Sequence, residues 1–242
     1  NLVGQIAVTA AIGYGLAIFA TSLINLWFDY PNTKEWTLLT YTVVMLIAVL
    51  LNMFKVSITA MLNTISAYWH MVGVLFIVLV LIIVPDNHQS VSYVFTQTIN
   101  NSGFSGTNFG SIVFWYVFGL GLLMSQYTIT GFDASAHMAE ETHQASRMAA
   151  VGMYMSVVVS VAFGWVLLLA VTFAVPDTQG TLDAVGNAVT YIWTTSMSQT
   201  WAEILLFICC VAQMFCLTAS VTSASRMMFA FSRDRAVPGH KL

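Results

Sequence analysis

Six long runs of apolar residues constrain the fold of this 242-residue chain more than any other feature. Of its residues, 58% are hydrophobic and only 7% are charged, whereas a soluble domain carries about a quarter charged residues. A run of about 20 apolar residues is long enough to cross a bilayer as an α-helix. The sequence therefore predicts an all-α, multi-pass integral membrane protein with six transmembrane helices. The predicted spans cover approximately residues 1–28, 36–54, 65–85, 109–131, 149–175 and 201–231.

The basic residues predict how these spans are oriented. Lys55 follows the second span, Arg147 the fourth and Arg233 the sixth, whereas the loops 86–108 and 176–200 contain no Lys or Arg. Basic residues accumulate on the cytoplasmic side of membrane proteins. We therefore expect the even-numbered loops and the C-terminal end in the cytoplasm.

Charge and cysteine content argue against several other functions. The net charge of −3 is dispersed and forms no basic face, so nucleic acid is not an expected partner. Cys209, Cys210 and Cys216 fall within one apolar run without metal-ligand spacing, and we interpret them as small hydrophobic residues. The chain also lacks paired catalytic groups within a span. No metal, cofactor or enzymatic activity is therefore expected.

A polar segment interrupts the fourth run at membrane depth. It reads Ser125-Gln-Tyr-Thr-Ile-Thr-Gly-Phe-Asp133 and contains a glycine. Backbone groups in hydrocarbon need internal partners, so such an interruption is tolerated where it lines protein or a wet cavity, and it is the best sequence indicator of a transporter's substrate site. We predict that the helix breaks around Ile129–Phe132 and continues as a second half-helix from near Asp133 to about residue 142.

An alternative is that the span ends near Ser125 and that residues 126–147 form a cytoplasmic loop. The length of the span argues against this alternative. The stretch from Phe109 to Ser125 has seventeen residues, which is at the lower limit of about 17 for a transmembrane helix. The residues after Ser125 also remain largely apolar.

The predicted break brings together groups that suit a small solute. Gly131 permits backbone angles that a β-carbon would block. Hydroxyl groups come from Tyr127, Thr128, Thr130 and Ser135, and the first N–H groups of a second half-helix would attract a carboxylate. The candidate substrate-binding residues of this span are Tyr127, Thr128, Ile129, Thr130, Gly131, Phe132 (as an apolar lid) and Asp133.

Asp133 has three possible roles, because an intramembrane carboxylate is a functional candidate by default. It would be an N-cap or gate residue, a proton carrier, or an anchor for a substrate amine. His137 lies one helical turn later and is a candidate to share a proton with Asp133. Glu140 and Glu141 are expected to be solvated.

The sixth span carries a second polar patch, which includes Thr218, Ser220, Thr222 and Ser223. Small hydroxyl residues at this spacing allow close packing between transmembrane helices. Their oxygen atoms would also suit Na⁺, which leaves a cation site as the second interpretation.

Two connecting segments are also expected to be structured. Residues 52–63 read as an amphipathic cytoplasmic stretch before the third span. Residues 182–193 have apolar residues at helical spacing, which predicts a helix on or dipping into the outer face. This helix would act as an outer gate, or it would lie at the interface, anchored by Tyr191 and Trp193.

Two motifs in this chain resemble a known family of transporters. The segment from Ser125 to Thr142 and the segment from Ser225 to Pro238 are similar to the amino acid–polyamine–organocation permeases, in particular to the branch of amino acid/choline and GABA permeases. The resemblance implies a LeuT-type core of two inverted five-helix repeats. The six spans would be helices three to eight, so we expect the chain to be a fragment without helices one and two and those after eight, and not to transport alone.

The resemblance also implies roles for individual residues. The break around Thr128–Asp133 would be the helix-six substrate site, and Gln5 would face the substrate. Thr218 and Ser220 would border the site or a sodium-equivalent position. Some family members carry a lysine in helix five in place of the cation, but the corresponding span here has only Trp69 and His70, which leaves H⁺ or Na⁺ open as the coupling ion.

Together, these features predict secondary active transport of an amino acid or a GABA-like amine by alternating access. The expected partners are the small solute, a co-transported H⁺ or Na⁺, and the lipid bilayer, with the plasma membrane as the expected location. The alternatives are a choline or polyamine transporter of the same family and a membrane sensor that binds amino acids without transporting them.

Overall fold

The computed structural model describes residues 2–53, 56–106, 108–139, 142 and 144–236. Lys55, Glu140 and Glu141, for which the sequence predicts a cytoplasmic or solvated position, lie outside these described residues. The described part of the chain forms helices, turns and irregular connections, without a β-strand. The helices are α1 (Leu2–Phe28), α2 (Lys34–Asn52), α3 (Val56–Ile83), α4 (Val91–Thr96), α5 (Ile112–Ile129), α6 (Ala134–His137), α7 (Ala145–Phe173), α8 (Thr178–Asp183), α9 (Ala188–Ser196) and α10 (Gln199–Arg233).

Six helices of the described chain are long and apolar enough to cross a membrane, namely α1, α2, α3, α5, α7 and α10. This finding confirms the predicted all-α class with six spanning segments. α10 has 35 residues and α7 has 29, which correspond to about 52 Å and 44 Å at 1.5 Å per residue. Both helices exceed the hydrocarbon thickness of about 30 Å, so they are tilted or extend beyond the bilayer.

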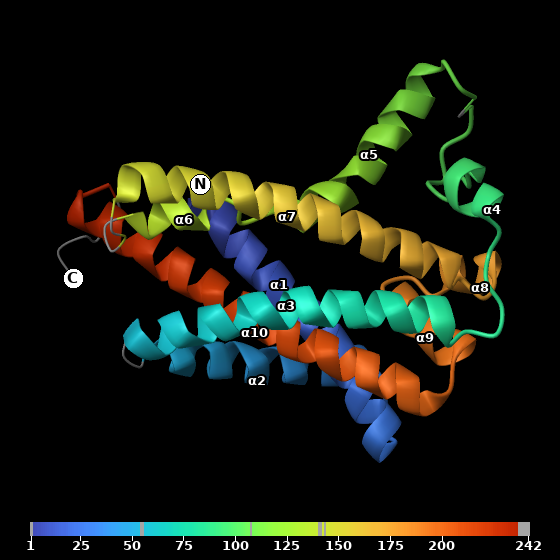
Figure 1. Cartoon of the computed structure of the whole chain (residues 1–242), viewed down its shortest axis with the longest axis horizontal. Coiled ribbons are helices and arrows are strands. Elements are labelled where there is room, and N and C mark those ends of the chain that lie inside the picture. Colours follow the sequence, from blue (N-terminus) through green and yellow to red (C-terminus); the bar gives the residue numbers. More distant parts are fainter. Residues whose placement is uncertain (1, 54–55, 107, 140–141, 143, 237–242) are drawn as a thin grey trace.

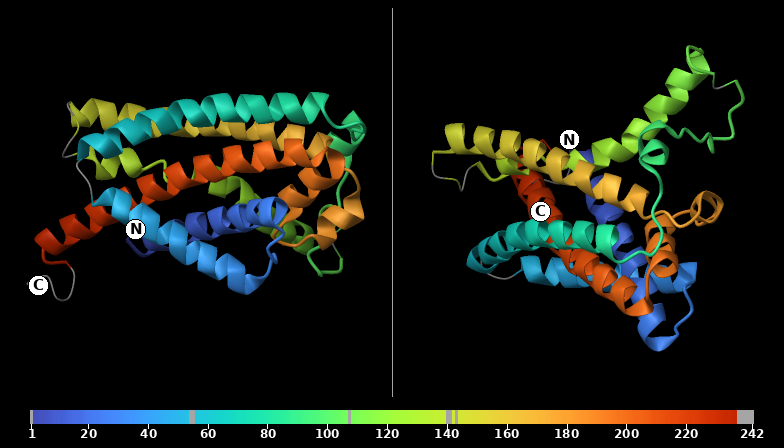
Figure 2. Two further views of the ribbon diagram at one scale, coloured as in Figure 1. Left: turned by 90° about the horizontal axis from the view of Figure 1, so that it is seen from below. Right: turned by 45° about the vertical axis from the view of Figure 1, so that its right-hand side comes forward.

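α10 is the central helix of the bundle. It packs against α1, α2 and α3, and α3 packs in turn against α7 (Figures 1 and 2). α5 is different, because it leans away from the bundle and approaches α7 at its C-terminal end (Figure 1). Among the residues of α5 whose burial the structure describes, none in its most apolar stretch is buried.

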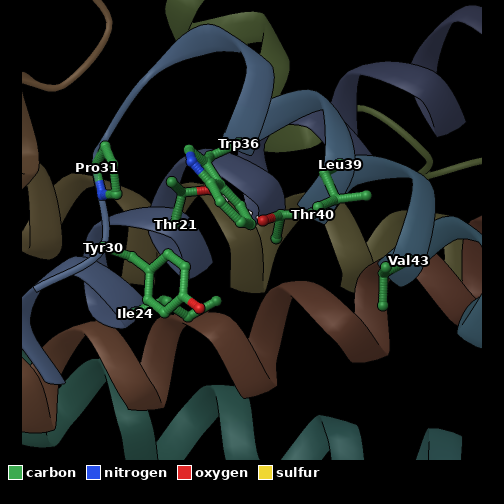
Figure 3. A pocket seen from close by; sticks show the side chains of 8 residues that line it. All are labelled: Thr21, Ile24, Tyr30, Pro31, Trp36, Leu39, Thr40 and Val43. Carbon is green, nitrogen blue, oxygen red and sulfur yellow. Dashed lines mark hydrogen bonds between the residues drawn. The ribbon is translucent and has the colours of Figure 1, made fainter. Parts of the chain in front are cut away.

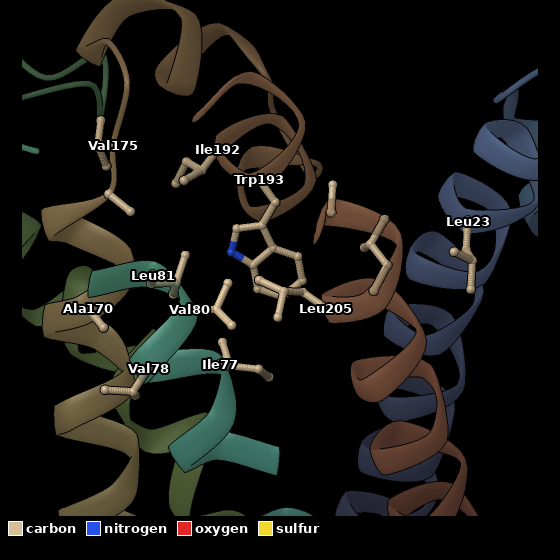
Figure 4. Packing of buried hydrophobic residues seen from close by; sticks show 13 residues of the cluster. Leu23, Ile77, Val78, Val80, Leu81, Ala170, Val175, Ile192, Trp193 and Leu205 are labelled. Carbon is tan, nitrogen blue, oxygen red and sulfur yellow. The ribbon is translucent and has the colours of Figure 1, made fainter. Parts of the chain in front are cut away.

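The largest hydrophobic cluster joins the ends of α3, α7 and α10 that the basic-residue pattern places outside. Trp193 of α9 is 2% exposed and lies at the centre of this cluster, between Val80 and Leu205 (Figure 4). A smaller cluster of Leu16, Ala48 and Leu217 joins α1, α2 and α10. The tightest apolar packing therefore lies at the predicted outer end of the molecule.

The structure corrects two predictions for the connecting segments. Residues 182–193 do not form one helix, because α8 ends at Asp183 and α9 begins at Ala188. Trp193 is buried in the core and does not serve as an interfacial anchor. The stretch before the third span is part of α3, which begins at Val56 and continues without interruption into the span.

Candidate substrate site

The helical backbone of the fourth span stops at Ile129, the last residue of α5. Thr130 is extended, with a ψ of 137°, and Gly131 has a φ of 88°, in the left-handed region that favours glycine. Tight turns follow, in which Phe132 N–H donates to the Ile129 carbonyl and Ala134 N–H donates to the Gly131 carbonyl. Among the hydrogen bonds of the described residues, the N–H groups of Gly131 and Asp133 have no backbone partner. These two N–H groups are therefore free to bind an anionic group.

Two glycines of α7 show at what depth this break lies. A β-carbon on Gly164 would lie 2.7 Å from Thr128 Cγ2, and one on Gly152 would lie 2.7 Å from Ser135 Oγ. The two glycines are separated by about 18 Å along α7, at 1.5 Å per residue, and they lie on either side of its midpoint. The segment from Thr128 to Ser135 therefore lies against α7 on both sides of the midpoint of that helix.

The structure corrects the predicted second half-helix and the role of Asp133 in it. α6 contains only four residues and does not continue to residue 142. The Asp133 side chain makes no capping hydrogen bond. Asp133 Oδ2 instead lies 3.3 Å from His137 Nε2, and the Asp133 side chain is 35% exposed while that of His137 is 16% exposed. The Asp133 carboxylate does not bind the first N–H groups of α6, so it is available for its contact with His137.

A cavity of about 340 Å³ lies beside α6. Its polar lining residues come from four parts of the chain: Asn63, Ser135, Thr142, Thr222 and Ser223. None of its described lining residues is charged. The Ser223 side chain is buried, and its Oγ has no hydrogen-bond partner among the described residues. A buried hydroxyl without a partner is unfavourable, but Oγ itself has almost no accessible surface.

Gln5 and Ser220 lie together, on the side of α10 that faces α1. Gln5 Nε2 donates to Ser220 Oγ at 3.3 Å and approaches the Ser220 carbonyl at 3.4 Å. Thr9 Oγ1 and Ser220 Oγ are 2.7 Å apart. This cluster contains several oxygen atoms, but its hydroxyl and amide groups already satisfy one another.

Thr218 serves the contact between α10 and α2. Its hydroxyl donates to the Met214 carbonyl, and its own carbonyl accepts from Asn52 Nδ2 at 3.1 Å. Asn52 Oδ1 in turn accepts from the Thr222 hydroxyl. The hydrogen bonds of Thr218 are those of a helix-packing residue.

The predicted site residues thus fall into two groups. Residues 127–133 and His137 lie at or next to the break, whereas Gln5, Thr218 and Ser220 take part in the contacts of α10 with α1 and α2. Tyr127 and Phe132 are 43% and 47% exposed, and Thr130 Oγ1 bonds back to the Gln126 carbonyl. The sequence analysis did not identify Thr9, Asn52 or Asn63 as residues of these polar contacts and of the cavity. Thr9 lies four residues after Gln5, so the helical spacing alone could have placed it on the same face of α1.

Another cavity, of about 230 Å³, lies between α1 and α2 (Figure 3). It is lined mainly by apolar and aromatic residues, which include Ile24, Tyr30 and Trp36. The rings of Tyr30 and Trp36 meet edge to face, with their centroids 4.9 Å apart. Tyr30 and Trp36 lie where α1 ends and α2 begins, and aromatic residues near the ends of spanning helices are typical of the membrane interface. No predicted site residue lines this cavity.

Comparison with known proteins shows that the chain is similar to amino acid permeases. A family model described as amino acid permease matches residues 1–241. The chain is 34% identical over 253 residues to the amino-acid permease BAT1 of Arabidopsis thaliana, covering 98% of the chain and 48% of that protein. It is 31% identical over 121 residues to the GABA-specific permease of Saccharomyces cerevisiae, covering 49% of the chain and 21% of that protein.

The polyamine transporter TPO5 of Saccharomyces cerevisiae is 25% identical over 246 residues, covering 98% of the chain and 38% of that protein. The chain thus spans about half the length or less of these relatives. No solved structure matches the chain. The relatives are permeases and not enzymes, in agreement with the expectation that the chain has no enzymatic activity.

Proposed function

The chain belongs to the amino acid permease family, and on that premise we propose that the protein carries a small zwitterionic amine, such as an amino acid or GABA, across the membrane. Transport is secondary active and proceeds by alternating access around the break after Ile129. The plasma membrane is the proposed location. The observation that carries the proposal is the helix break at the middle of a spanning bundle, beside a hydroxyl-lined cavity without charged lining residues.

The chemistry of the break favours a solute with both a negative and a positive group. The N–H groups of Gly131 and Asp133 would bind the carboxylate, because neither donates a hydrogen bond to a backbone acceptor of the described chain. The Asp133 carboxylate would bind the ammonium group, in place of or together with its contact to His137. The remaining polar contacts would come from neutral hydroxyl and amide groups.

The same features argue against a polyamine as the main substrate. A polyamine carries several positive charges, and each needs a carboxylate or a similar partner when it leaves water. Asp133 is the one carboxylate at the described break, and the cavity lining adds none among its described residues. A small net-neutral solute leaves fewer charges without a partner.

Uptake by the full-length protein in proteoliposomes tests this proposal. Labelled amino acid or GABA should accumulate, with competition by zwitterionic amines stronger than competition by choline or polyamines. Gly131→Leu and Asp133→Ala should abolish uptake at unchanged expression. Gly121→Leu is the matched control: a β-carbon meets no atom within 4 Å at either glycine, but only Gly131 has a positive φ that a side chain disfavours.

Unchanged uptake in both Gly131→Leu and Asp133→Ala would contradict the proposed site. Binding of labelled substrate without any uptake into the vesicles would indicate the alternative function, a sensor that binds amino acids without transporting them.

A further inference from the structure

The loop before α5 carries the sequence Asn100-Asn-Ser102, which has the form of the acceptor motif for N-linked glycosylation. The motif requires an Asn, then any residue except Pro, and then Ser or Thr. No other position in the 242 residues of the chain meets this requirement. Because so short a motif also arises by chance, the surroundings of Asn100 decide whether it is a site.

Asn100 lies in an exposed stretch of this loop. Every residue from 95 to 106 is exposed, and beyond the end of α4 at Thr96 the stretch has no regular secondary structure. The motif is also well separated from the two neighbouring spans, since α3 ends at Ile83 and α5 begins at Ile112. A large enzyme that modifies side chains therefore has access to Asn100.

The part of the loop nearer to α3 is instead held against the bundle. Gln89 Nε2 donates to the Val175 carbonyl at 2.9 Å, and the Tyr93 hydroxyl lies 2.8 Å from Thr178 Oγ1 at the start of α8. The acceptor motif follows this anchored part and lies outside it. A bulky group on Asn100 would therefore leave these contacts in place.

The charge pattern places the loop on the side of the membrane where oligosaccharide is transferred. N-glycosylation acts on segments that enter the secretory pathway and become the outer surface of the cell. The loop 86–108 contains no Lys or Arg, and it lies at the opposite end of the molecule from the start of α7 and the end of α10 (Figure 1). Those two helix ends carry Arg147 and Arg233, which mark the cytoplasmic side.

The Asn100 side chain is held in a turn with the hydroxyl that the motif requires. Asn100 Oδ1 accepts from the Ser102 N–H at 3.1 Å and from the Ser102 hydroxyl at 2.6 Å. Hydrogen bonds to an amide oxygen draw electron density toward it, so the hydrogens on Nδ2 become more acidic. Nδ2 also donates to the Phe104 carbonyl at 2.7 Å. This bond is exposed, so water replaces it at little cost when Nδ2 reacts.

We propose that Asn100 is a site of N-linked glycosylation, with a lipid-pyrophosphate-linked oligosaccharide as the donor. Asn100 Nδ2 forms a bond to C1 of the first sugar, and the bond between C1 and the pyrophosphate oxygen breaks. The lipid pyrophosphate leaves with the electron pair of that bond, and Nδ2 gives up one proton to a base of the transferase. This modification goes beyond the proposed transport function and is independent of it.

The gel mobility of the full-length protein, produced in a eukaryotic cell that carries out N-glycosylation, tests the proposal. Digestion with peptide N-glycosidase should increase the mobility of the wild type in a single step, because the chain has one motif in this loop. Asn100→Gln and Ser102→Ala should already run at the higher mobility and not respond to the enzyme. Asn101→Gln and Ser102→Thr are the matched controls, since both keep an acceptor motif and should respond as the wild type does.

A second control tests the side of the membrane. Gln144→Asn creates an acceptor motif with Ser146, at two exposed positions of the basic end. In the Asn100→Gln background this motif should stay unmodified, because the basic end faces the cytoplasm. A wild type that does not respond to the glycosidase, or an Asn100→Gln variant that still responds, would overturn the proposal. Modification of the Gln144→Asn motif would overturn it as well, since the loop with Asn100 would then face the cytoplasm.

Discussion

Asp177 shows how a single side chain shapes the outer surface of the protein. Its Oδ2 accepts from the Tyr191 hydroxyl at 2.6 Å, and its Oδ1 accepts from Gly180 N–H at 2.5 Å. The hydrogen bond from Tyr191 has the larger effect and that from Gly180 the smaller, and together they hold the pKa of Asp177 below its ordinary value of 3.8. The same bond raises the pKa of Tyr191. Asp177 thus joins the first turn of α8 to α9.

Replacement of Tyr191 by Phe should raise the pKa of Asp177 toward 3.8, because the hydrogen bond that lowers this pKa most is lost. The folded pKa is depressed, so the stabilisation is complete at neutral pH and is lost as the pH falls from 3.8 through the folded pKa. The chemical shift of isotopically labelled Asp177 in the purified protein measures this titration.

Tyr93→Phe provides the control for this titration. Tyr93 bonds to Thr178, next to Asp177 in the sequence, but not to the carboxylate. Its removal should leave the pKa of Asp177 unchanged. An equal pKa of Asp177 in the wild type and Tyr191→Phe would show that the Tyr191 contact is not formed in solution.

At the scale of single elements, α7 packs against the broken span on both sides of the break. Gly164 faces Thr128 before the break, and Gly152 faces Ser135 after it. Because these two glycines have no side chain, the segments before and after the break approach α7 closely. Small residues have the same effect at helix interfaces in membranes. The position of the break therefore depends on the shape of a neighbouring helix.

Gly152→Val and Gly164→Val should each destabilise the protein by about 1–3 kcal/mol, the typical cost of overpacking. The added atoms would overlap Ser135 or Thr128, so we also expect weaker substrate binding. Thermal unfolding of the full-length protein in detergent and a binding assay measure the two effects.

Gly121→Val is the matched control on α5, since a β-carbon there meets no atom within 4 Å. Its unfolding temperature should stay close to that of the wild type. Equal losses in all three variants would mean that valine itself disfavours these helices, and that the contacts of α7 with the break are not responsible.

At the scale of the whole molecule, the orientation of the bundle follows from a few charges. Arg147, Arg233 and Arg235 lie at the same end of the molecule, where α7 begins and α10 ends (Figure 1). The loop before α5 and the α8–α9 segment lie at the opposite end and contain no basic residue. This arrangement agrees with a cytoplasmic location of the basic end.

A membrane-impermeant maleimide applied to intact cells should label Ser102→Cys and not Ser146→Cys. Both positions are exposed, but Ser102 lies in the loop before α5 and Ser146 in the first turn of α7. Ser146→Cys should react only after the membrane is permeabilised. The unmodified protein, which retains its native cysteines, serves as the background, and the opposite labelling pattern would reverse the predicted orientation.

Much of the architecture could be predicted from the sequence by itself. The six spans and the all-α class follow from composition, because hydrocarbon accepts only segments whose backbone groups bond within the segment. The polar interruption at Gly131 was visible for the same reason, since its residue types do not suit an unbroken apolar helix. Local chemistry and the nature of the solvent are sufficient for these inferences.

The tertiary structure alone decided how these elements meet. α6 is a single turn, Trp193 is a core residue, Thr218 bonds toward α2, and His70 faces Cys216. Each of these facts depends on residues that are distant in the sequence, and the spans are too uniformly apolar to indicate which face meets which neighbour. Side chains from separate helices create the cavity and the histidine–thiol pair, so these features exist only once the helices have packed.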